Sequence, residues 1–387
     1  MKVSLMGLGD QVRDPVTGNR EDAAQRHRAM VEAAVVADET GEFDHHSADF
    51  AAGWRGQYRD IRATCPVMRV DAQGGFVLLT RYEDIKHVLL APKEFASGRD
   101  LELDGVPGTV TGGVTVPANP FRMGMMEMDA PESVRLRKIL LPWFSARAVE
   151  LNAVYLRDLV TWCLDRVIES GRCDVVNDLA NPLPALATLD LMGLPLENWE
   201  RYARVLHGAV YREKGSAREL AWLQGDLRAI VTERRVSPPA VPTPVDALLA
   251  AEADGVPLPT DLVVELVYML LSGGIDISTA LIAHGLRYLS GHPELAAELR
   301  GQPDLVPGAI LLTEVLTRMP DLRVDEDAVR PYETIPLVGG FRAMPATFTP
   351  GPKTGRFPAG GLPPARGERD RLRAAQAAAG EPGGESA

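Results

Sequence analysis

Cysteine is scarce in this sequence, with three residues in 387, at positions 65, 163 and 173. A small, odd number argues against the disulfide framework of a secreted protein and indicates a reducing compartment. The sequence also lacks the spacings Cys-x-x-Cys and His-x-x-x-His. Zinc sites commonly use such pairs, so no metal-ligating residue is predicted.

An excess of positive charge is absent as well. The 53 acidic and 41 basic side chains leave a formal charge of −12, and the isoelectric point is near 5.2. Binding to nucleic acid requires a clustered cationic surface that neutralises phosphates. The charge balance therefore argues against a nucleic-acid partner.

Long apolar runs are missing too. The first 25 residues contain no run of the roughly 7–15 apolar residues that a signal peptide requires. The longest apolar window, Leu262–Leu271, is interrupted by Glu265 and falls short of the about 20 residues that span a bilayer. The spacings of a phosphate-binding loop and of a Gly-x-Ser-x-Gly elbow are also absent. A soluble, cytoplasmic protein without a membrane partner is expected.

The composition that remains is ordinary for a globular protein, with 45% hydrophobic and 24% charged residues. The length predicts one large domain or two. Phe76–Thr80 is typical of a strand, and Tyr82–Leu90 of a short amphipathic helix that ends before Pro92. Residues 103–124 are rich in glycine, valine and proline without a helical period, which predicts a long loop.

Helical periodicity dominates from Ala130 to Arg300. The predicted helices are Pro131–Leu141, Ala146–Ser170, Ala185–Leu194, Glu197–Tyr211, Glu219–Arg235 and Thr260–Leu289. At 1.5 Å per residue the last would be about 45 Å long and must run through the core. The predicted fold class is therefore mainly α with small β-sheets.

Both ends of the chain differ in composition from the middle. Residues 1–40 are predicted to be a polar lead-in with one short helix around Glu21–Ala37. The last 37 residues, Gly351–Ala387, contain 8 glycines, 5 prolines and almost no large apolar side chains. Such a segment cannot bury enough surface to offset the entropy of ordering, so 351–387 is predicted to be disordered.

Four groups of residues, taken in chain order, carry a resemblance to a known family. They are Arg62–Val67 with Gly75–Asp84, Met128–Lys138 with Phe144–Glu150, Leu270–Thr279 with Ala283–Glu294, and Leu316–Arg323 with Ile335–Pro345. In this order they resemble the first sheet, the C helix, the long I helix, and the end of the L helix with the C-terminal sheet of bacterial soluble cytochromes P450. The resemblance covers about residues 41–350. It implies a P450-like fold, a haem cofactor, and oxidation of a lipophilic small molecule with electrons from a ferredoxin-type donor.

The long predicted helix supplies most of the candidate site. Two adjacent glycines inside a helix, Gly273 and Gly274, cost about 1 kcal/mol each relative to alanine, so something must offset them. In the resembled family this pair faces the haem; the alternative is close packing of another backbone on it. Asp276 lies among apolar residues, where a carboxylate needs a partner. The resemblance makes Asp276 a residual proton-relay acid, with a helix-surface acid as the alternative, and makes Arg137 a cation facing the cofactor.

Two elements of the resembled family are missing. Its haem iron is held by a cysteine thiolate located after the I helix, but no cysteine follows Cys173 here. Its K helix carries a Glu-x-x-Arg pair, whereas Leu305–Ile310, which resembles the start of that helix, runs directly into Leu311–Met319, which resembles the end of the L helix. Glu314 and Arg318 are interpreted as a solvated surface pair. These absences predict an internal deletion near residue 310, of about 80–100 residues.

Two single positions also depart from the family pattern. Ser133 stands where many members have a histidine that bonds a haem propionate, and Ile277 stands where most have a threonine that relays protons. Three functions stay open. The chain is a monooxygenase by descent, impaired because its cysteine ligand is absent; or a haem-free helper of a partner enzyme or small-molecule-binding protein; or an inactive truncated product. Haem is implied by the family, but its usual ligand is missing.

Overall fold

The computed structural model describes residues 3–5, 43–72, 75–103, 106–111, 113–116, 121–302, 310–335, 338–355, 357, 361–366, 368 and 369. The helix predicted around Glu21–Ala37 lies outside these residues. The chain divides into two compact units. The first unit is Met1–Arg137 with Glu333–Leu337, and the second is Lys138–Tyr332 with Val338–Ala387. The boundary falls within helix α4, Glu132–Leu140.

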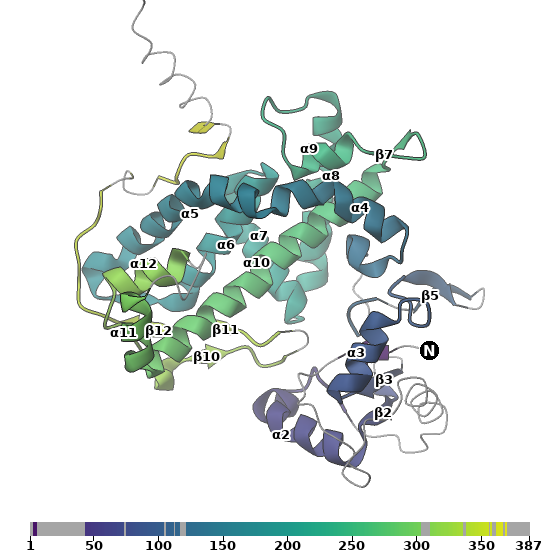
Figure 1. Ribbon diagram of the computed structural model, residues 1–387, viewed down its shortest axis with the longest axis horizontal. Helices are drawn as coiled ribbons and strands as arrows, with labels where there is room; N and C mark the ends of the chain where they lie inside the picture. The colour runs from purple at the N-terminus through teal and green to yellow at the C-terminus, as the bar shows by residue number, and fades with distance from the viewer. Residues whose placement is uncertain are drawn as a thin grey trace, which may run out of the picture. The chain divides into compact units, whose positions relative to one another are not determined.

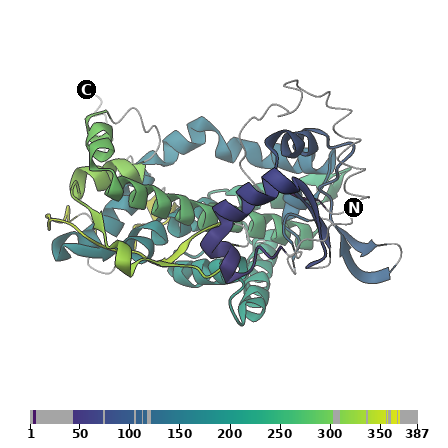
Figure 2. The same ribbon diagram turned by 90° about the horizontal axis from the view of Figure 1, so that it is seen from below.

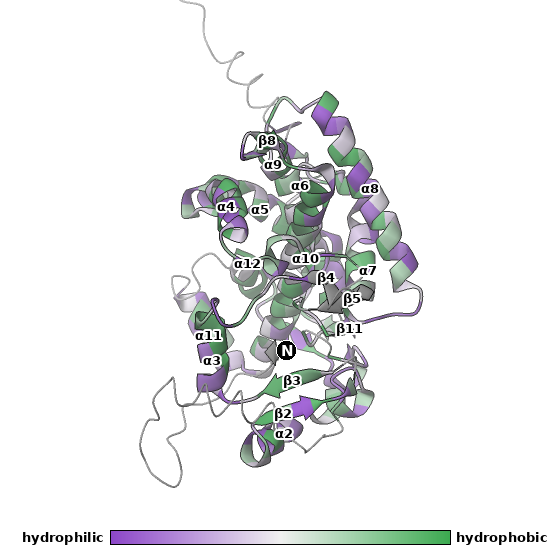
Figure 3. Ribbon diagram, turned by 90° about the vertical axis from the view of Figure 1, so that its right-hand side faces the viewer, coloured by the Kyte–Doolittle hydropathy of each residue, from purple (hydrophilic) through white to green (hydrophobic). Residues whose placement is uncertain are grey.

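The first unit is built on a three-stranded sheet of order β1-β3-β2. Its strands are β1 (Val3–Leu5), β2 (Val67–Val70) and β3 (Phe76–Leu79), with β3 parallel to β1 and antiparallel to β2. All four residues of β3 are buried, and the strand is uniformly hydrophobic in Figure 3. The helices are α2 (Ala48–Thr64) and α3 (Tyr82–Leu90). The predicted strand and helix at 76–90 are therefore confirmed.

The loop predicted over 103–124 is wrong in its first half. Strands β4 (Asp100–Leu103) and β5 (Val106–Thr111) pair as an antiparallel hairpin. Asp104-Gly105 between them is a strong hairpin signal in the sequence, and β5 is rich in β-branched residues. Glycine and proline in the segment suggested irregular structure, but the described residues on both sides of 104–105 pair as strands.

Helices form most of the second unit, as predicted. They are α5 (Ala146–Val167), α6 (Pro182–Met192), α7 (Trp199–Val210), α8 (Ser216–Val236), α9 (Pro244–Leu249), α10 (Thr260–Gly291), α11 (Pro293–Gly301) and α12 (Ile310–Arg318). A π-helical segment, Val175–Ala180, precedes α6. Short 3₁₀ turns lie at Gly124–Glu127, Leu141–Phe144, Ile168–Ser170, Leu196–Asn198 and Glu326–Ala328.

Helix α10 is the central element of the second unit. It packs against α6, α7, α8 and the π-helical segment, and it runs diagonally among them in Figure 1. Figure 2 shows the same elements from below. Among the described residues it is the one helix long and apolar enough to cross a membrane, but 61% of its apolar window is buried inside the protein. Burial on this scale is the mark of a core helix.

One face of α10 is nevertheless uncovered. Ile277, Leu281 and Tyr288 are 51%, 72% and 57% exposed. The spacings of four and seven place these side chains on the same side of the helix. The second unit therefore presents an apolar stripe, named the α10 stripe below.

Small sheets complete the second unit. One has the order β6-β12-β9, from Arg172–Asp174, Pro345–Thr347 and Arg323–Val324, and another pairs β10 (Arg330–Pro331) with β11 (Phe341–Ala343). A two-stranded hairpin joins β7 (Glu252–Ala253) to β8 (Val256–Pro257). These short sheets fix the segments after α12 against the helices.

Part of the segment predicted to be a disordered tail instead makes specific contacts. Trp162 donates its ring N–H to the carbonyl of Gly361 at 2.7 Å. Arg369 donates to both oxygens of the buried Asp190 at 3.1 and 2.9 Å, and the Arg366 backbone N–H donates to the same carboxylate at 2.7 Å. Composition missed this because the segment is held by charged and polar bonds, with little apolar burial. Residues 370–387 lie outside the described part of the chain.

The interpretation of Glu314 and Arg318 as a solvated pair is also wrong. Arg318 forms its ion pair with Asp165 on α5, and both side chains are 14% exposed. Asp165 accepts further bonds from the backbone N–H and hydroxyl of Thr354, at 3.0 and 2.7 Å. Burial alone would raise the pKa of Asp165, but these hydrogen bonds outweigh it and hold the pKa below its ordinary value.

Candidate functional site

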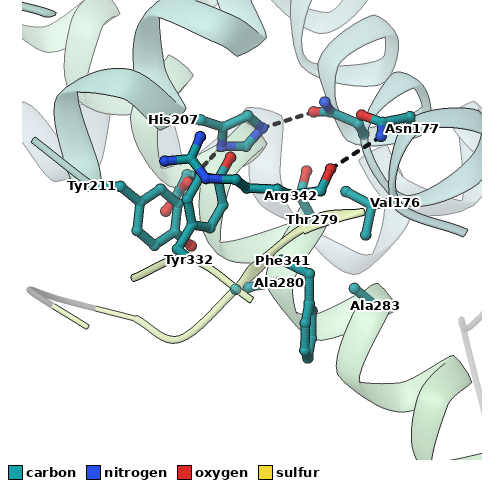
Figure 4. Close-up of a pocket in the computed structure, with 13 residues that line it drawn as sticks. Val176, Asn177, His207, Tyr211, Thr279, Ala280, Ala283, Tyr332, Phe341 and Arg342 are labelled. Atoms are coloured by element: carbon teal, nitrogen blue, oxygen red, sulfur yellow. Dashed lines mark hydrogen bonds and ion pairs between the residues drawn. The ribbon is translucent and has the colours of Figure 1, made fainter. Parts of the chain in front are cut away.

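A small cavity lies in the second unit, between α10 and the segments packed on it. Its volume is about 30 Å³, enough for about two water-sized groups. Figure 4 shows the side chains that surround it. The lining residues are Val176, Asn177, Asn181, His207, Tyr211, Asp276, Thr279, Ala280, Ala283, Tyr332, Gly340, Phe341 and Arg342. The cavity thus brings Asp276 together with polar groups from four other parts of the chain.

Asp276 is buried, with 2% of its surface exposed, so it is not a helix-surface acid. Its Oδ1 lies 2.7 Å from Nδ1 of His207, and Nε2 of the same ring lies 2.7 Å from Oδ1 of Asn181. The carboxylate predicted to need a partner therefore has one. The imidazole is therefore held between Asp276 on α10 and Asn181, which lies just before α6.

Local sequence explains how His207 reaches this position. Helix α7 buries one face, and Tyr202, Ala203 and Leu206 on that face are no more than 1% exposed. His207 follows Leu206 and lies four residues, about one helical turn, after Ala203, which places it on the buried side. The position of His207 on the apolar side of an amphipathic helix is a sequence signal for a buried histidine. It does not identify the partner, because Asp276 lies 69 positions away.

Two buried atoms at the cavity have no hydrogen-bond partner among the described residues. They are Oδ2 of Asp276 and Oγ1 of Thr279. Thr279 is 6% exposed and lies three residues after Asp276, on the same side of α10. Buried polar atoms in native proteins are nearly always bonded, so these two identify a place for a further hydrogen-bonding group.

The opposite wall of the cavity is aromatic. The rings of Tyr211 and Tyr332 stack with centroids 3.5 Å apart and planes 10° from parallel. Burial and the nearby charge of Asp276 raise the pKa of Tyr211, and burial with Glu213 raises the pKa of Tyr332 to about 12. Both phenols are therefore neutral at physiological pH. Gly340 leaves the room that the Tyr211 hydroxyl occupies, because an added Cβ would overlap it.

The positive charge of Arg342, which lines the cavity, is neutralised by a neighbouring carboxylate. Its guanidinium pairs with Glu213 and lies 4.7 Å from the centroid of the Tyr332 ring. Its backbone carbonyl accepts a 3.1 Å hydrogen bond from Nδ2 of Asn177, drawn in Figure 4. Strand β11 is thereby tied to the π-helical segment.

The two glycines of α10 have different surroundings. An added Cβ on Gly274 would lie 2.5 Å from Oγ1 and 2.8 Å from Cγ2 of Thr188 on α6. An added Cβ on Gly273 would meet no atom within 4 Å. Close helix packing therefore accounts for Gly274, while Gly273 lies on the exposed side of the helix. Helix α10 is continuous through both.

Arg137 is exposed and lies at the end of the first unit. The cavity and both glycines belong to the second unit, and each unit is described by itself. The role of Arg137 as a cofactor-facing cation stays a prediction.

No family model matches the sequence. Among solved structures, the cytochrome P450 PksS of Bacillus subtilis 168 superposes with a TM-score of 0.66 at 16% identity, over 79% of this chain and 100% of that one. Cytochrome P450 107B1 of Saccharopolyspora erythraea is 29% identical over 270 residues, 67% of this chain and 65% of the relative. The cyclomarin C epoxidase of Salinispora arenicola is 30% identical over 287 residues, 70% of this chain and 69% of the relative. The chain belongs to the cytochrome P450 family.

The P450 fold is mainly helical with small sheets, as the sequence predicted. The chain spans about two thirds of the length of these curated relatives, 65% and 69%. The likeness to the solved structure extends to the fold alone, because the identity is 16%.

The cysteines of this P450 do not fit a thiolate-bound haem. Cys163 on α5 and Cys173 on β6 are buried, and burial raises the pKa of both thiols to about 12. A haem-ligating cysteine must be a thiolate. Cys65 belongs to the first unit, and its thiol donates to the Val67 carbonyl at 3.4 Å. No cluster of three metal-ligating side chains occurs in the described part of the chain.

Proposed function

We propose that this P450 acts without thiolate-bound haem, as a haem-free small-molecule-binding protein, and that the monooxygenase reaction of its family is impaired in it. The observation that carries the proposal is the position of the cysteines. No cysteine follows Cys173, whereas the haem iron of the family is held by a cysteine thiolate located after the long helix. Cys163 and Cys173 are buried in α5 and β6, which precede that helix.

The binding part of the proposal rests on the cavity beside α10. Its polar groups converge on one space, and two of its buried atoms lack partners among the described residues. Concave sites with a few convergent polar groups are the usual places for small ligands. Family descent supports a lipophilic molecule as the ligand.

A second candidate is a helper role toward a partner enzyme. The α10 stripe, formed by Ile277, Leu281 and Tyr288, favours it, because exposed apolar side chains on one side of a helix are a feature of protein contact surfaces. The helper role predicts that Leu281→Lys abolishes activation of an enzyme encoded nearby. Val236→Lys, on an exposed apolar residue of α8, is the matched control.

The internal deletion also belongs to this proposal. Helix α11 ends at Gly301 and α12 begins at Ile310, with residues 303–309 outside the described part of the chain. We infer that a K-to-L segment was removed near residue 310. The surrounding nucleotide sequence tests this inference. If DNA that encodes the K-to-L segment lies in frame beside codon 310, the deletion is recent or an artefact.

Haem content tests the main proposal. The full chain is expressed with added haem precursor and purified beside cytochrome P450 107B1 as a positive control. We expect far less than one haem per chain and no thiolate-type Soret band after reduction under carbon monoxide. A reduced ferredoxin should not be oxidised faster in its presence. Stoichiometric haem with a thiolate-type band would overturn the proposal.

Thermal unfolding separates a functional haem-free protein from an inactive product. A sharp, reversible transition without added haem supports a packed binding protein. A broad, irreversible one supports the inactive product, because an unfilled void lowers stability.

A further inference from the structure

We propose that the cavity beside α10 binds the primary ammonium group of a small amine. The inference names a ligand class for the binding function proposed above and rests on that proposal. It starts from the two buried atoms without partners, Oδ2 of Asp276 and Oγ1 of Thr279. Both residues line the same cavity and are more than nine-tenths buried.

Size limits the group that can enter. A cavity of about 30 Å³ admits a head group no larger than about two waters. An ammonium is of that size and offers three N–H donors, whereas a hydroxyl offers one and a quaternary ammonium offers none. Oδ2 of Asp276 can only accept when ionised, and Oγ1 of Thr279 can also accept. The unpartnered atoms therefore match a group with several donors.

The charges facing the cavity favour a cation. The guanidinium of Arg342 is already paired with Glu213, and the phenols of Tyr211 and Tyr332 are neutral. The remaining ionisable groups are Asp276 and His207. His207 is bonded at both ring nitrogens, whereas Oδ2 of Asp276 has no partner among the described residues, and a bound cation supplies donors to it.

Methylammonium chloride is the probe, titrated calorimetrically into the purified full chain at pH 8. Methanol controls for size and tetramethylammonium chloride for charge, all at constant ionic strength. We expect saturable methylammonium binding and no comparable binding of either control. Equal binding of methanol or tetramethylammonium, or none of methylammonium, would leave a water-filled cavity and overturn the inference.

Variants on α10 test the two acceptors. Asp276→Asn should weaken methylammonium binding by on the order of ten-fold or more, and Thr279→Val by about three-fold or more. Asp261→Asn is the matched control, because this acid is exposed on the same helix, is paired with Arg228 and lies outside the cavity. If Asp276→Asn does not fold, the Thr279→Val variant and the comparison of methylammonium with methanol and tetramethylammonium still test the site. Unchanged affinity in the pocket variants would refute the site.

Haem content is measured on the same preparation. A thiolate-type band together with Asp276-dependent amine binding would contradict the proposed haem-free function and support the amine site. A haem-free protein that binds no methylammonium would support the haem-free state and contradict the amine site.

Discussion

Asp276 and His207 lie 69 positions apart in the chain and form a buried pair, with 2.7 Å between Oδ1 and Nδ1. The pair joins the central helix α10 to α7. Its side chains are 2% and 10% exposed, so the loss of either partner leaves a buried polar group without its hydrogen bond. The pair is therefore sensitive to single substitutions.

His207→Leu should lower the free energy of unfolding by about 3–5 kcal/mol, because it leaves the Asp276 carboxylate buried without its partner. The double variant His207→Leu with Asp276→Leu should recover much of that loss, since no buried charge then remains. Urea unfolding followed by circular dichroism measures both. A double variant as unstable as the sum of its single changes would contradict this account.

The glycine pair offers a second matched comparison. Gly273→Ala should stabilise the protein by about 0.5–1 kcal/mol, because the position is open and alanine favours the helix. Gly274→Ala should destabilise it by about 1–3 kcal/mol, because the new methyl group meets Thr188. Adding Thr188→Ala to Gly274→Ala should restore most of the loss. The same urea measurement applies, and equal effects at both glycines would show that α6 does not pack as observed.

Local patterns in the sequence were sufficient for the helices but not for the site. Helix α10 was predicted because apolar residues repeat with the helical period and His292-Pro293 follows. The need of Asp276 for a partner followed from its apolar neighbours. The identity of that partner did not, because no local signal connects His207 to a residue 69 positions later. Arg318 illustrates the same limit: Glu314 lies one helical turn before it in the sequence, but its partner is Asp165 on another helix.

The depressed pKa of Asp165 predicts a pH-dependent contribution to stability. A carboxyl whose folded pKa lies below its unfolded value, near 3.8, stabilises the fold above that value and loses the contribution as pH falls through the folded pKa. Asp165→Asn should therefore lower stability at pH 7, and the difference from the parent should shrink as pH falls below about 4. Urea unfolding from pH 7 to pH 3 measures it. Asp261→Asn, in an exposed pair, should show little difference at any pH. A constant difference for Asp165→Asn would contradict the linkage.

Thiol reactivity gives an independent check on the cysteines. The thiols of Cys163 and Cys173 have a pKa of about 12 and are almost wholly protonated at pH 8, so both should react with a disulfide reagent only after unfolding. Half-buried Cys65 should react first. We expect one fast equivalent in the native protein and three in denaturant, with Cys65→Ser removing the fast one. Fast reaction of Cys163 or Cys173 would show an accessible thiolate and reopen haem ligation.

The α10 stripe can be tested by charge insertion on two sides of one helix. Leu281 is 72% exposed and Leu271 is fully buried. Leu281→Lys should change the free energy of unfolding by no more than about 0.5 kcal/mol, as surface substitutions usually do. Leu271→Lys should cost about 4 kcal/mol or more, because it buries an unpaired ammonium in the core. Thermal and urea unfolding measure both. A severe loss in Leu281→Lys would mean that other residues of the chain cover the stripe, and the helper role would lose its supporting observation.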